Sequence, residues 1–420
     1  MSDCVEVAIT SDSSDQLWSC CVWDVRTGTH LISYKGGGAA GARTLATISD
    51  QYILTGNMVK PMLHIWPINR HEAIATRFIL PGRPTAVAVS PDGAYCVVAV
   101  QETINVYQMA TGAMLATISR HYQTVNVIRF TDDGTHFLSA GHDGMVLVWS
   151  LSQVVRVFQK QSFSAFYSFS DHALPVTDLY VGKGGMKALF CSVSSDRTCK
   201  IYDLSSGSML LNLVFQEPLS SVTMDTLESN VFVGTNEGPI YSFSLLSPPR
   251  TKEYHVDRKQ QHKNVFLGHK KAVTCLSVSI DGETLLSGGA DENVFLWHSK
   301  SRQQLRMIPH KGVITNAQFM LTPKAMFDQE IKPRLQFQPF QKMVYSSEKI
   351  DDLVVEVDVK DNVRESVTYK GLDNTSSNTN GGNVSNQQDE IIKLKKEIQH
   401  LKSINKEMFE YTIKNVLQNS

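Results

Sequence analysis

Short runs of alternating apolar and polar residues, separated by turn residues, fill about the first three quarters of the chain. The clearest example is residues 273–308, where four such runs are divided by turns such as Ile280-Asp281-Gly282. A period of two marks strands with one buried face, and tight turns between them indicate an antiparallel meander. The pattern predicts a four-stranded unit, which residues 86–118 and 125–150 repeat.

An aromatic residue ends one strand of every such unit. The seven anchors are Trp23, Trp66, Tyr107, Trp149, Tyr202, Phe243 and Trp297, at spacings of 43, 41, 42, 53, 41 and 54 residues. A four-stranded repeat of this length cannot bury its own apolar face, so it stacks on its neighbours. We therefore predict an all-β fold, a closed propeller of seven blades, with eight blades as the alternative.

The N-terminal unit supplies three strands rather than four. An apolar run at 313–321, beyond the seventh anchor, provides the missing first strand of that unit. Its pairing with the N-terminal strands would close the ring and remove exposed strand edges. Residues 1–321 are therefore expected to form one propeller domain.

The pattern changes after residue 321. Residues 322–370 contain three prolines and then a β-like run, and we expect this extension to pack on the propeller or on a partner. Residues 371–388 are rich in Asn, Ser and Gly and predict a flexible linker. Residues 389–417 predict a coiled-coil helix, with core positions at steps of three and four: Ile391, Leu394, Ile398, Leu401, Asn405 and Met408. Pairing with itself, pairing with a partner helix and lying on the propeller all stay open.

Three predicted blades share a fuller polar pattern of His, Ser, Asp and aromatic anchor at recurring offsets. The sets are His121, Ser139, Asp143 and Trp149; His172, Ser192, Asp196 and Tyr202; and His269, Ser287, Asp291 and Trp297. Ser, His and Asp also make up hydrolase triads, but a triad occurs once per active site, whereas this set recurs at a structural period. We expect a buried hydrogen-bonded network that stiffens each blade, and no catalytic residue.

The other four blades carry Leu17, Lys60, Gln101 and Glu237 at the position of the Asp. Without that carboxylate, we expect these blades to depend on apolar packing alone and to be locally softer.

A formal net charge of −1 gives no general attraction to nucleic acid or to anionic lipid. A local exception is the long connection at 247–264, whose basic residues are Arg250, Lys252, Arg258, Lys259 and Lys263. Two interpretations stay open, a solvated surface loop and a contact with RNA phosphates or an acidic protein surface.

The seven cysteines show no zinc-binding spacing, so we expect no metal and no cofactor. No apolar run reaches the length of a membrane span, and the first residues do not resemble a signal peptide. These features predict a soluble intracellular protein.

Six segments carry a resemblance to a known family: residues 6–13, 18–37, 119–130, 171–179, 266–297 and 401–412. They resemble one group of the WD-repeat family, the propeller subunits of the nuclear complex that matures the large ribosomal subunit. The resemblance implies a non-enzymatic scaffold for 60S biogenesis and for processing of the pre-rRNA internal transcribed spacer. It also implies a location in nucleolus and nucleoplasm, with the cytoplasm left open.

The partners that this resemblance implies are a proline-, glutamate- and leucine-rich scaffold protein, a testis-expressed helical-repeat protein, the AAA ATPase midasin and the pre-60S particle. It further implies a homodimer formed through the C-terminal helix. Because one fold hosts many functions, an alternative is a signalling or ubiquitin-ligase adaptor whose propeller recognises peptide motifs.

Overall fold

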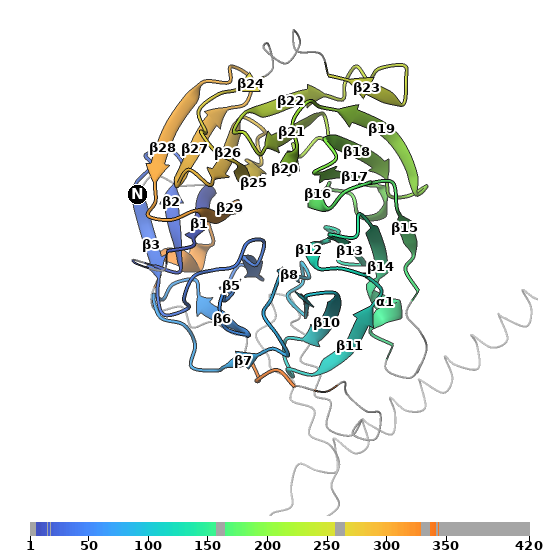
Figure 1. The fold of residues 1–420 in the computed structure, drawn as a ribbon. Coiled ribbons are helices and arrows are strands. Elements are labelled where there is room, and N and C mark those ends of the chain that lie inside the picture. Colours follow the sequence, from blue (N-terminus) through green and yellow to red (C-terminus); the bar gives the residue numbers. More distant parts are fainter. Residues whose placement is uncertain are drawn as a thin grey trace, which may run out of the picture. The chain divides into compact units, whose positions relative to one another are not determined.

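Seven β-sheets surround a central axis, as Figure 1 shows. This computed structural model describes residues 6–14, 16, 18–156, 164–256, 265–328, 337–341 and 343. Within these residues, six sheets have four strands and one has five, which confirms the propeller of seven blades. The linker expected at 371–388 and the helix expected at 389–417 lie outside the described residues.

Each blade is a meander of four antiparallel strands that runs outward from the axis, and blade 5 has one further strand that pairs in parallel. Blades 1 to 3 are β29 (Ile314–Leu321), β1 (Glu6–Asp12), β2 (Cys20–Asp24) and β3 (His30–Tyr34); β4 (Ala46–Ile48), β5 (Tyr52–Gly56), β6 (Met62–Pro67) and β7 (Phe78–Ile79); and β8 (Ala86–Val89), β9 (Tyr95–Val100), β10 (Thr103–Gln108) and β11 (Met114–Ser119). Blades 4 and 5 are β12 (Val125–Phe130), β13 (His136–Gly141), β14 (Val146–Ser150) and β15 (Tyr167–Phe169); and β16 (Val176–Val181), β17 (Leu189–Ser194), β18 (Thr198–Asp203), β19 (Ser208–Val214) and β23 (Glu253–His255). Blades 6 and 7 are β20 (Leu219–Met224), β21 (Asn230–Thr235), β22 (Ile240–Ser244) and β24 (Val265–Phe266); and β25 (Val273–Val278), β26 (Thr284–Gly289), β27 (Asn293–His298) and β28 (Gln304–Pro309).

The ring closes through the strand that the sequence places at 313–321. This strand is β29, and it pairs antiparallel with β1 along its length, from Glu6 opposite Leu321 to Asp12 opposite Ile314. The first and last strands of the ring thus lie in one sheet, and the edge of β1 that would otherwise be unpaired is covered by β29.

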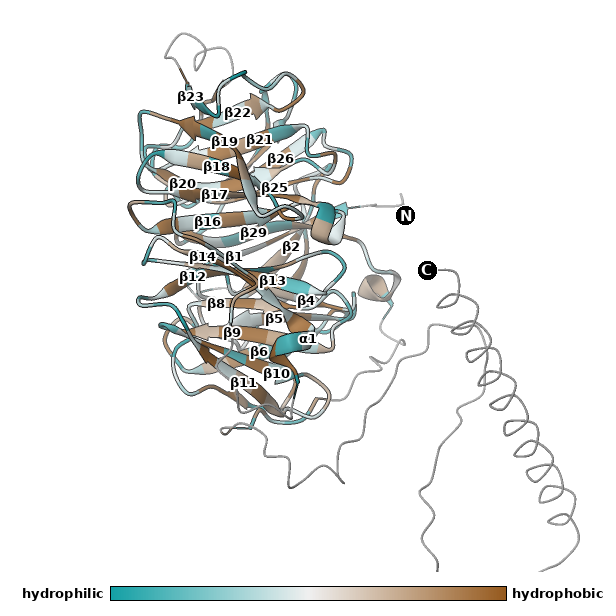
Figure 2. Cartoon of the chain, turned by 90° about the vertical axis from the view of Figure 1, so that its right-hand side faces the viewer, coloured by the Kyte–Doolittle hydropathy of each residue, from teal (hydrophilic) through white to brown (hydrophobic). Residues whose placement is uncertain are grey.

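All seven aromatic anchors lie on the third strand of their blades, counted from the axis. Trp66, Trp149 and Trp297 are almost completely buried, and the core clusters join residues of neighbouring blades. Figure 2 shows the same segregation, with hydrophobic residues along the strands and hydrophilic ones in the connections. Truncating a buried aromatic of this size costs roughly 3–5 kcal/mol, so the anchors are central to blade stacking.

Two long connections widen the repeat. The first connection contains the short helix α1 (Leu151–Val154) before β15. The second connection lies between β22 and β24 of blade 6 and contains β23, which pairs in parallel with β19 as the fifth strand of blade 5. The connection between β16 and β17 forms a 3₁₀ turn, η1 (Gly185–Lys187).

After β29 the chain continues against blades 1 to 3. A second 3₁₀ turn, η2 (Lys324–Phe327), buries Met326 in the core cluster shared by blades 1 and 2. The Asn69 side-chain amide donates to the Asp328 carbonyl at 2.9 Å. Residues 337–341 then lie against blades 2 and 3, where Phe340 is 6% exposed. The described parts of the extension therefore pack on the propeller.

Candidate functional site

In blade 4 the four predicted residues form one continuous chain of hydrogen bonds. The Trp149 indole N–H donates to Ser139 Oγ at 2.9 Å, and Ser139 Oγ lies 2.8 Å from His121 Nε2. His121 Nδ1 lies 2.9 Å from Asp143 Oδ2. A neutral imidazole with its proton on Nδ1 satisfies every bond, since Nε2 then accepts from the serine and Nδ1 donates to the carboxylate.

Blade 7 repeats this geometry, and blade 5 modifies it. Ser287 accepts from the Trp297 indole at 2.8 Å and lies 2.8 Å from His269 Nε2, while His269 Nδ1 lies 3.0 Å from Asp291. In blade 5, His172 contacts Ser192 at 2.7 Å and Asp196 at 2.9 Å. Its anchor is a tyrosine, and the Tyr202 hydroxyl donates to Asp171 at 3.0 Å.

The Asp of each network also joins two connections through backbone N–H groups. Asp143 accepts from the backbone of Tyr122, in the loop that enters the blade, and of Met145, in its own hairpin, both at 3.1 Å. Burial of Asp143 opposes its ionisation, but these bonds and His121 outweigh it and lower the pKa of that carboxyl. The carboxylate is thus the stable form, and it fixes the position of one loop relative to the other.

The Ser–His–Asp connectivity matches that of a hydrolase triad, but burial argues against a nucleophile. Ser139, Ser192 and Ser287 are all 0% exposed, so no substrate carbonyl can reach their hydroxyls. In blades 4 and 7, an indole N–H also occupies the serine oxygen. The three sets therefore act as blade cross-links.

Blade 1 contains a related network whose members do not stand at the offsets of the other three. The Trp23 indole donates to Thr10 Oγ1 at 2.7 Å, and Thr10 Oγ1 lies 2.9 Å from His310 Nε2. The expectation that this blade depends on apolar packing alone is wrong. A longer β1–β2 connection moves Thr10 out of the regular offset, and ring closure brings His310 from 300 residues away. One usable signal was present, because His310 precedes Ile314 by the same four residues that separate the other histidines from their first strands.

Among the residues that the structure describes, blades 3 and 6 show no such network. Val98 and Val233 occupy the register position of the network serine, and Gln101 and Glu237 occupy that of the aspartate. Blade 2 is intermediate: its Thr55 hydroxyl is buried without a hydrogen-bond partner among the described residues, and its Trp66 indole donates to the Lys35 carbonyl at 2.9 Å. Lys60 is exposed there, and Leu17 of blade 1 lies outside the described residues.

The basic connection is partly structured. Arg250 and Lys252 are exposed, while the Lys252 carbonyl accepts from the Asn212 backbone at 2.7 Å as β23 joins blade 5. Arg258, Lys259 and Lys263 lie outside the described residues, as do the six core positions of the expected C-terminal helix.

The axial cavity, about 220 Å³, is crossed by an ion pair. Arg43, just before the innermost strand of blade 2, reaches Asp178 of blade 5 at 3.0 Å and the Ser220 carbonyl at 3.0 Å. The backbone N–H of Val222, in blade 6, donates to the other oxygen of Asp178. The pair therefore ties three blades together across the axis.

Within the described part of the chain, no group of three or more His, Cys, Asp or Glu side chains is arranged to hold a metal ion. In the same residues, no helix is long and apolar enough to cross a membrane.

Comparison with known proteins identifies close relatives. The family "WD domain, G-beta repeat" matches residues 112–150 and 260–298. The WD repeat-containing protein 18 of Rattus norvegicus is 39% identical over 348 residues, which are 83% of this chain and 80% of that protein. The Danio rerio protein of that name is 34% identical over 98% of both chains. The "Pre-rRNA-processing protein pro-1" of Caenorhabditis elegans is 24% identical over 85% of this chain and 69% of its own length.

Proposed function

The chain belongs to the family of WD repeat-containing protein 18, and on this basis we propose that it is a non-enzymatic scaffold subunit of a nuclear complex for 60S ribosome biogenesis. The observation that carries the proposal is the similarity over most of the chain to that family, together with the weaker similarity to a protein named for pre-rRNA processing. The work of the complex would include processing of the pre-rRNA internal transcribed spacer. A nucleolar and nucleoplasmic location follows from the same proposal.

The structure supports a scaffold because its polar networks are internal and rigid. The hydroxyls and imidazoles that could do chemistry in blades 4, 5 and 7 are bonded to one another and buried. A ring braced in this way presents loops at fixed positions, which is what simultaneous binding of several proteins requires. The proposed partners are the proline-, glutamate- and leucine-rich scaffold protein, the testis-expressed helical-repeat protein, midasin and the pre-60S particle.

Affinity purification of the full chain from nuclear extract, followed by mass spectrometry, tests this proposal. Recovery of pre-60S factors and of precursor rRNA containing the internal transcribed spacer is the expected result. Recovery of cullin adaptors or pathway receptors instead would support the alternative adaptor function. Depletion of the protein should lead to accumulation of unprocessed spacer RNA, and normal processing after depletion would contradict the proposal.

We also propose that residues 389–417 dimerise the protein, which would double its number of partner sites and raise avidity. Deleting 389–420 should convert a dimer into a monomer in light scattering. Replacing both Leu394 and Leu401 by Asp, which keeps the length of the chain, should have the same effect. A molar mass that still corresponds to a dimer in both variants would refute the proposal.

A further inference from the structure

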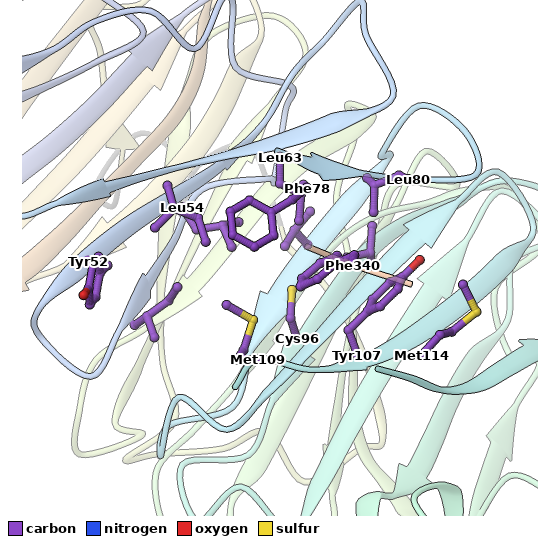
Figure 3. Close-up of a cluster of buried hydrophobic side chains, with 14 of the residues drawn as sticks. Tyr52, Leu54, Leu63, Phe78, Leu80, Cys96, Tyr107, Met109, Met114 and Phe340 are labelled. Carbon is purple, nitrogen blue, oxygen red and sulfur yellow. The ribbon is translucent and has the colours of Figure 1, made fainter. Parts of the chain in front are cut away.

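Residues 337–341 pack on blades 2 and 3, and Figure 3 shows Phe340 among the side chains of the core cluster that these blades share. We call the surface that the segment covers, around Tyr52, Phe78, Tyr107 and Gly112, the groove. The Phe340 ring stacks on Tyr107, with centroids 4.3 Å apart and planes 8° apart, and meets Phe78 edge-on at 5.0 Å. Three residues earlier, Phe337 meets Tyr52 edge-on at 4.7 Å. Two phenylalanines spaced by three residues therefore occupy two adjoining aromatic subsites.

The groove also holds the backbone of this segment. The Gln341 N–H donates to the Gly112 carbonyl at 2.8 Å. Gly112 has a φ of +67°, and a Cβ at that position would collide with the carbonyl oxygen of Pro339. The bend at Gly112 thus allows a second backbone to approach closely, which a side chain would prevent.

The fit is incomplete at one polar atom. The Tyr107 side chain is 0% exposed, and its hydroxyl has no hydrogen-bond partner among the described residues. Leaving a buried hydroxyl unpaired is unfavourable, and the stacked Phe340 supplies no acceptor. Gln338, Pro339 and Gln341 meanwhile remain exposed. Dissociation of the segment would return this hydroxyl to water and remove that cost.

We propose that this groove is a peptide-binding site with the pattern Phe-x-x-Phe, and that residues 337–341 are its ligand, bound in cis and able to dissociate while the propeller stays folded. The inference is independent of the proposed role in ribosome biogenesis. Attachment of the chain at Met326 and Asp328 keeps this ligand close to its groove, at an effective concentration on the order of millimolar. At that effective concentration, two aromatic contacts are enough to keep the groove occupied by residues 337–341. A peptide in solution has to compete with this segment of the same chain.

Binding in trans to the full-length chain tests the proposal. The double variant Phe337→Ala/Phe340→Ala empties the groove, and the probe is a labelled peptide with the sequence of residues 335–343. We expect saturable binding to the double variant and binding at least tenfold weaker to the wild type, in which the cis segment competes. The matched control is Gln338→Ala, an exposed position between the two phenylalanines, which should behave like the wild type. A probe with both phenylalanines replaced by Ala should bind neither protein.

Tyr107 provides a separate readout of the site. Adding Tyr107→Phe to the double variant should tighten peptide binding several-fold, because a hydroxyl that is hydrated in the empty groove is no longer buried unpaired by the ligand. A folded double variant that fails to bind the peptide would overturn the proposal, and so would a double variant that has lost its β circular dichroism.

Hydrogen exchange on the unmodified chain gives an answer that does not depend on a variant folding. A dissociable ligand predicts that the Gln341 amide exchanges at least a hundredfold faster than amides of β9 and β10. Equal protection would show that the segment opens only when the whole propeller unfolds, which would make it part of the core.

Discussion

Blades 4, 5 and 7 and blades 2, 3 and 6 position their aromatic anchors by different means. In the first group, a His–Ser–Asp network within the blade links the second strand to two loops, and in blades 4 and 7 its serine also accepts from the indole of the anchor. In the second group no such network forms, and chain segments from outside the blade pack on the anchors instead. Phe340 stacks on Tyr107 of blade 3, and Tyr254 of β23 packs against Phe243 of blade 6 at 5.8 Å.

Blade 2 follows the same rule as its neighbours in the second group. Met326 shares a core cluster with Trp66, and Phe337 contacts Tyr52 and Phe78. All three blades that lack the polar network thus have a segment from outside the blade in the core around the anchor, although such segments are not confined to them, since α1 lies in the cluster that contains Trp149 of blade 4. The comparison teaches that a propeller can be stiffened locally by buried polar bonds or by added apolar cover, and that the two solutions differ in how easily they can be removed.

The largest expected effect comes from breaking one polar network. Asp143→Ala should lower the free energy of unfolding by roughly 3 kcal/mol, since it leaves the buried His121 Nδ1 and two backbone N–H groups without their acceptor. The matched control is Glu237→Ala, the corresponding exposed position of blade 6, which should change stability by less than about 0.5 kcal/mol. Urea unfolding measures both, and equal losses would remove the distinction between the two groups of blades.

The next effect comes from the added cover. Phe340→Ala should destabilise the protein by about 2 kcal/mol, the burial free energy of one phenylalanine side chain, and the loss should be local. Hydrogen exchange should accelerate in β9 and β10 but not in β13 and β14 of blade 4. In the wild type we expect the amides of blades 2 and 3 to exchange faster than those of blades 4 and 7. The reverse order would contradict the view that apolar cover stabilises a blade less than a polar network does.

A pH titration separates the networks that contain histidine from the apolar blades. Burial lowers the pKa of His269 and also that of His310, although Asp291 raises the pKa of the former. Because each folded pKa lies below the unfolded value of about 6.5, the unfolded chain binds more protons in the window between the two, so stability falls as pH falls below about 6.5. His310→Gln should reduce this loss relative to the wild type when melting temperatures are followed from pH 7.5 to 5.

The same titration continues at lower pH through the carboxylates. The pKa values of Asp143 and Asp196 are lowered by their hydrogen bonds despite burial, so their contribution is complete above about pH 4 and is lost as pH falls further. A melting temperature that stays level from pH 6.5 to 3 would show that the networks are not coupled to folding.

The smallest effect should come from removing the unpaired hydroxyls of the network-free blades. Tyr107→Phe and Thr55→Val should each be neutral or stabilise the protein by up to about 1 kcal/mol, because each removes a buried hydroxyl with no partner. Ser139→Ala is the contrasting substitution, since its hydroxyl bonds both Trp149 and His121 and its loss should destabilise. A clear loss of stability from Tyr107→Phe would show that its hydroxyl has a bonding partner after all.

The spacing of the aromatic anchors was sufficient to predict the blades, because each anchor occupies the same position on the same strand of a local meander. The three full networks were equally visible, since their members lie within about 30 residues of one another at recurring offsets. Local spacing in the sequence becomes local geometry in a repeat, and this is why pattern alone was enough for the His–Ser–Asp bonds of blades 4, 5 and 7, although it did not predict that Tyr202 bonds Asp171.

Contacts between distant parts of the chain required the tertiary structure. The contact between Thr10 and His310 depends on ring closure. Phe340 stacks on Tyr107 because the extension returns along blades 2 and 3. The Arg43–Asp178 pair forms because two blades face each other across the axis. No periodicity links such positions, because their proximity results from closing the ring rather than from the repeat. The sequence by itself thus determined the repeat of the blades and the polar networks of blades 4, 5 and 7. Only the folded ring decided how the blades without a polar network are braced, since that bracing is built from segments outside the repeat.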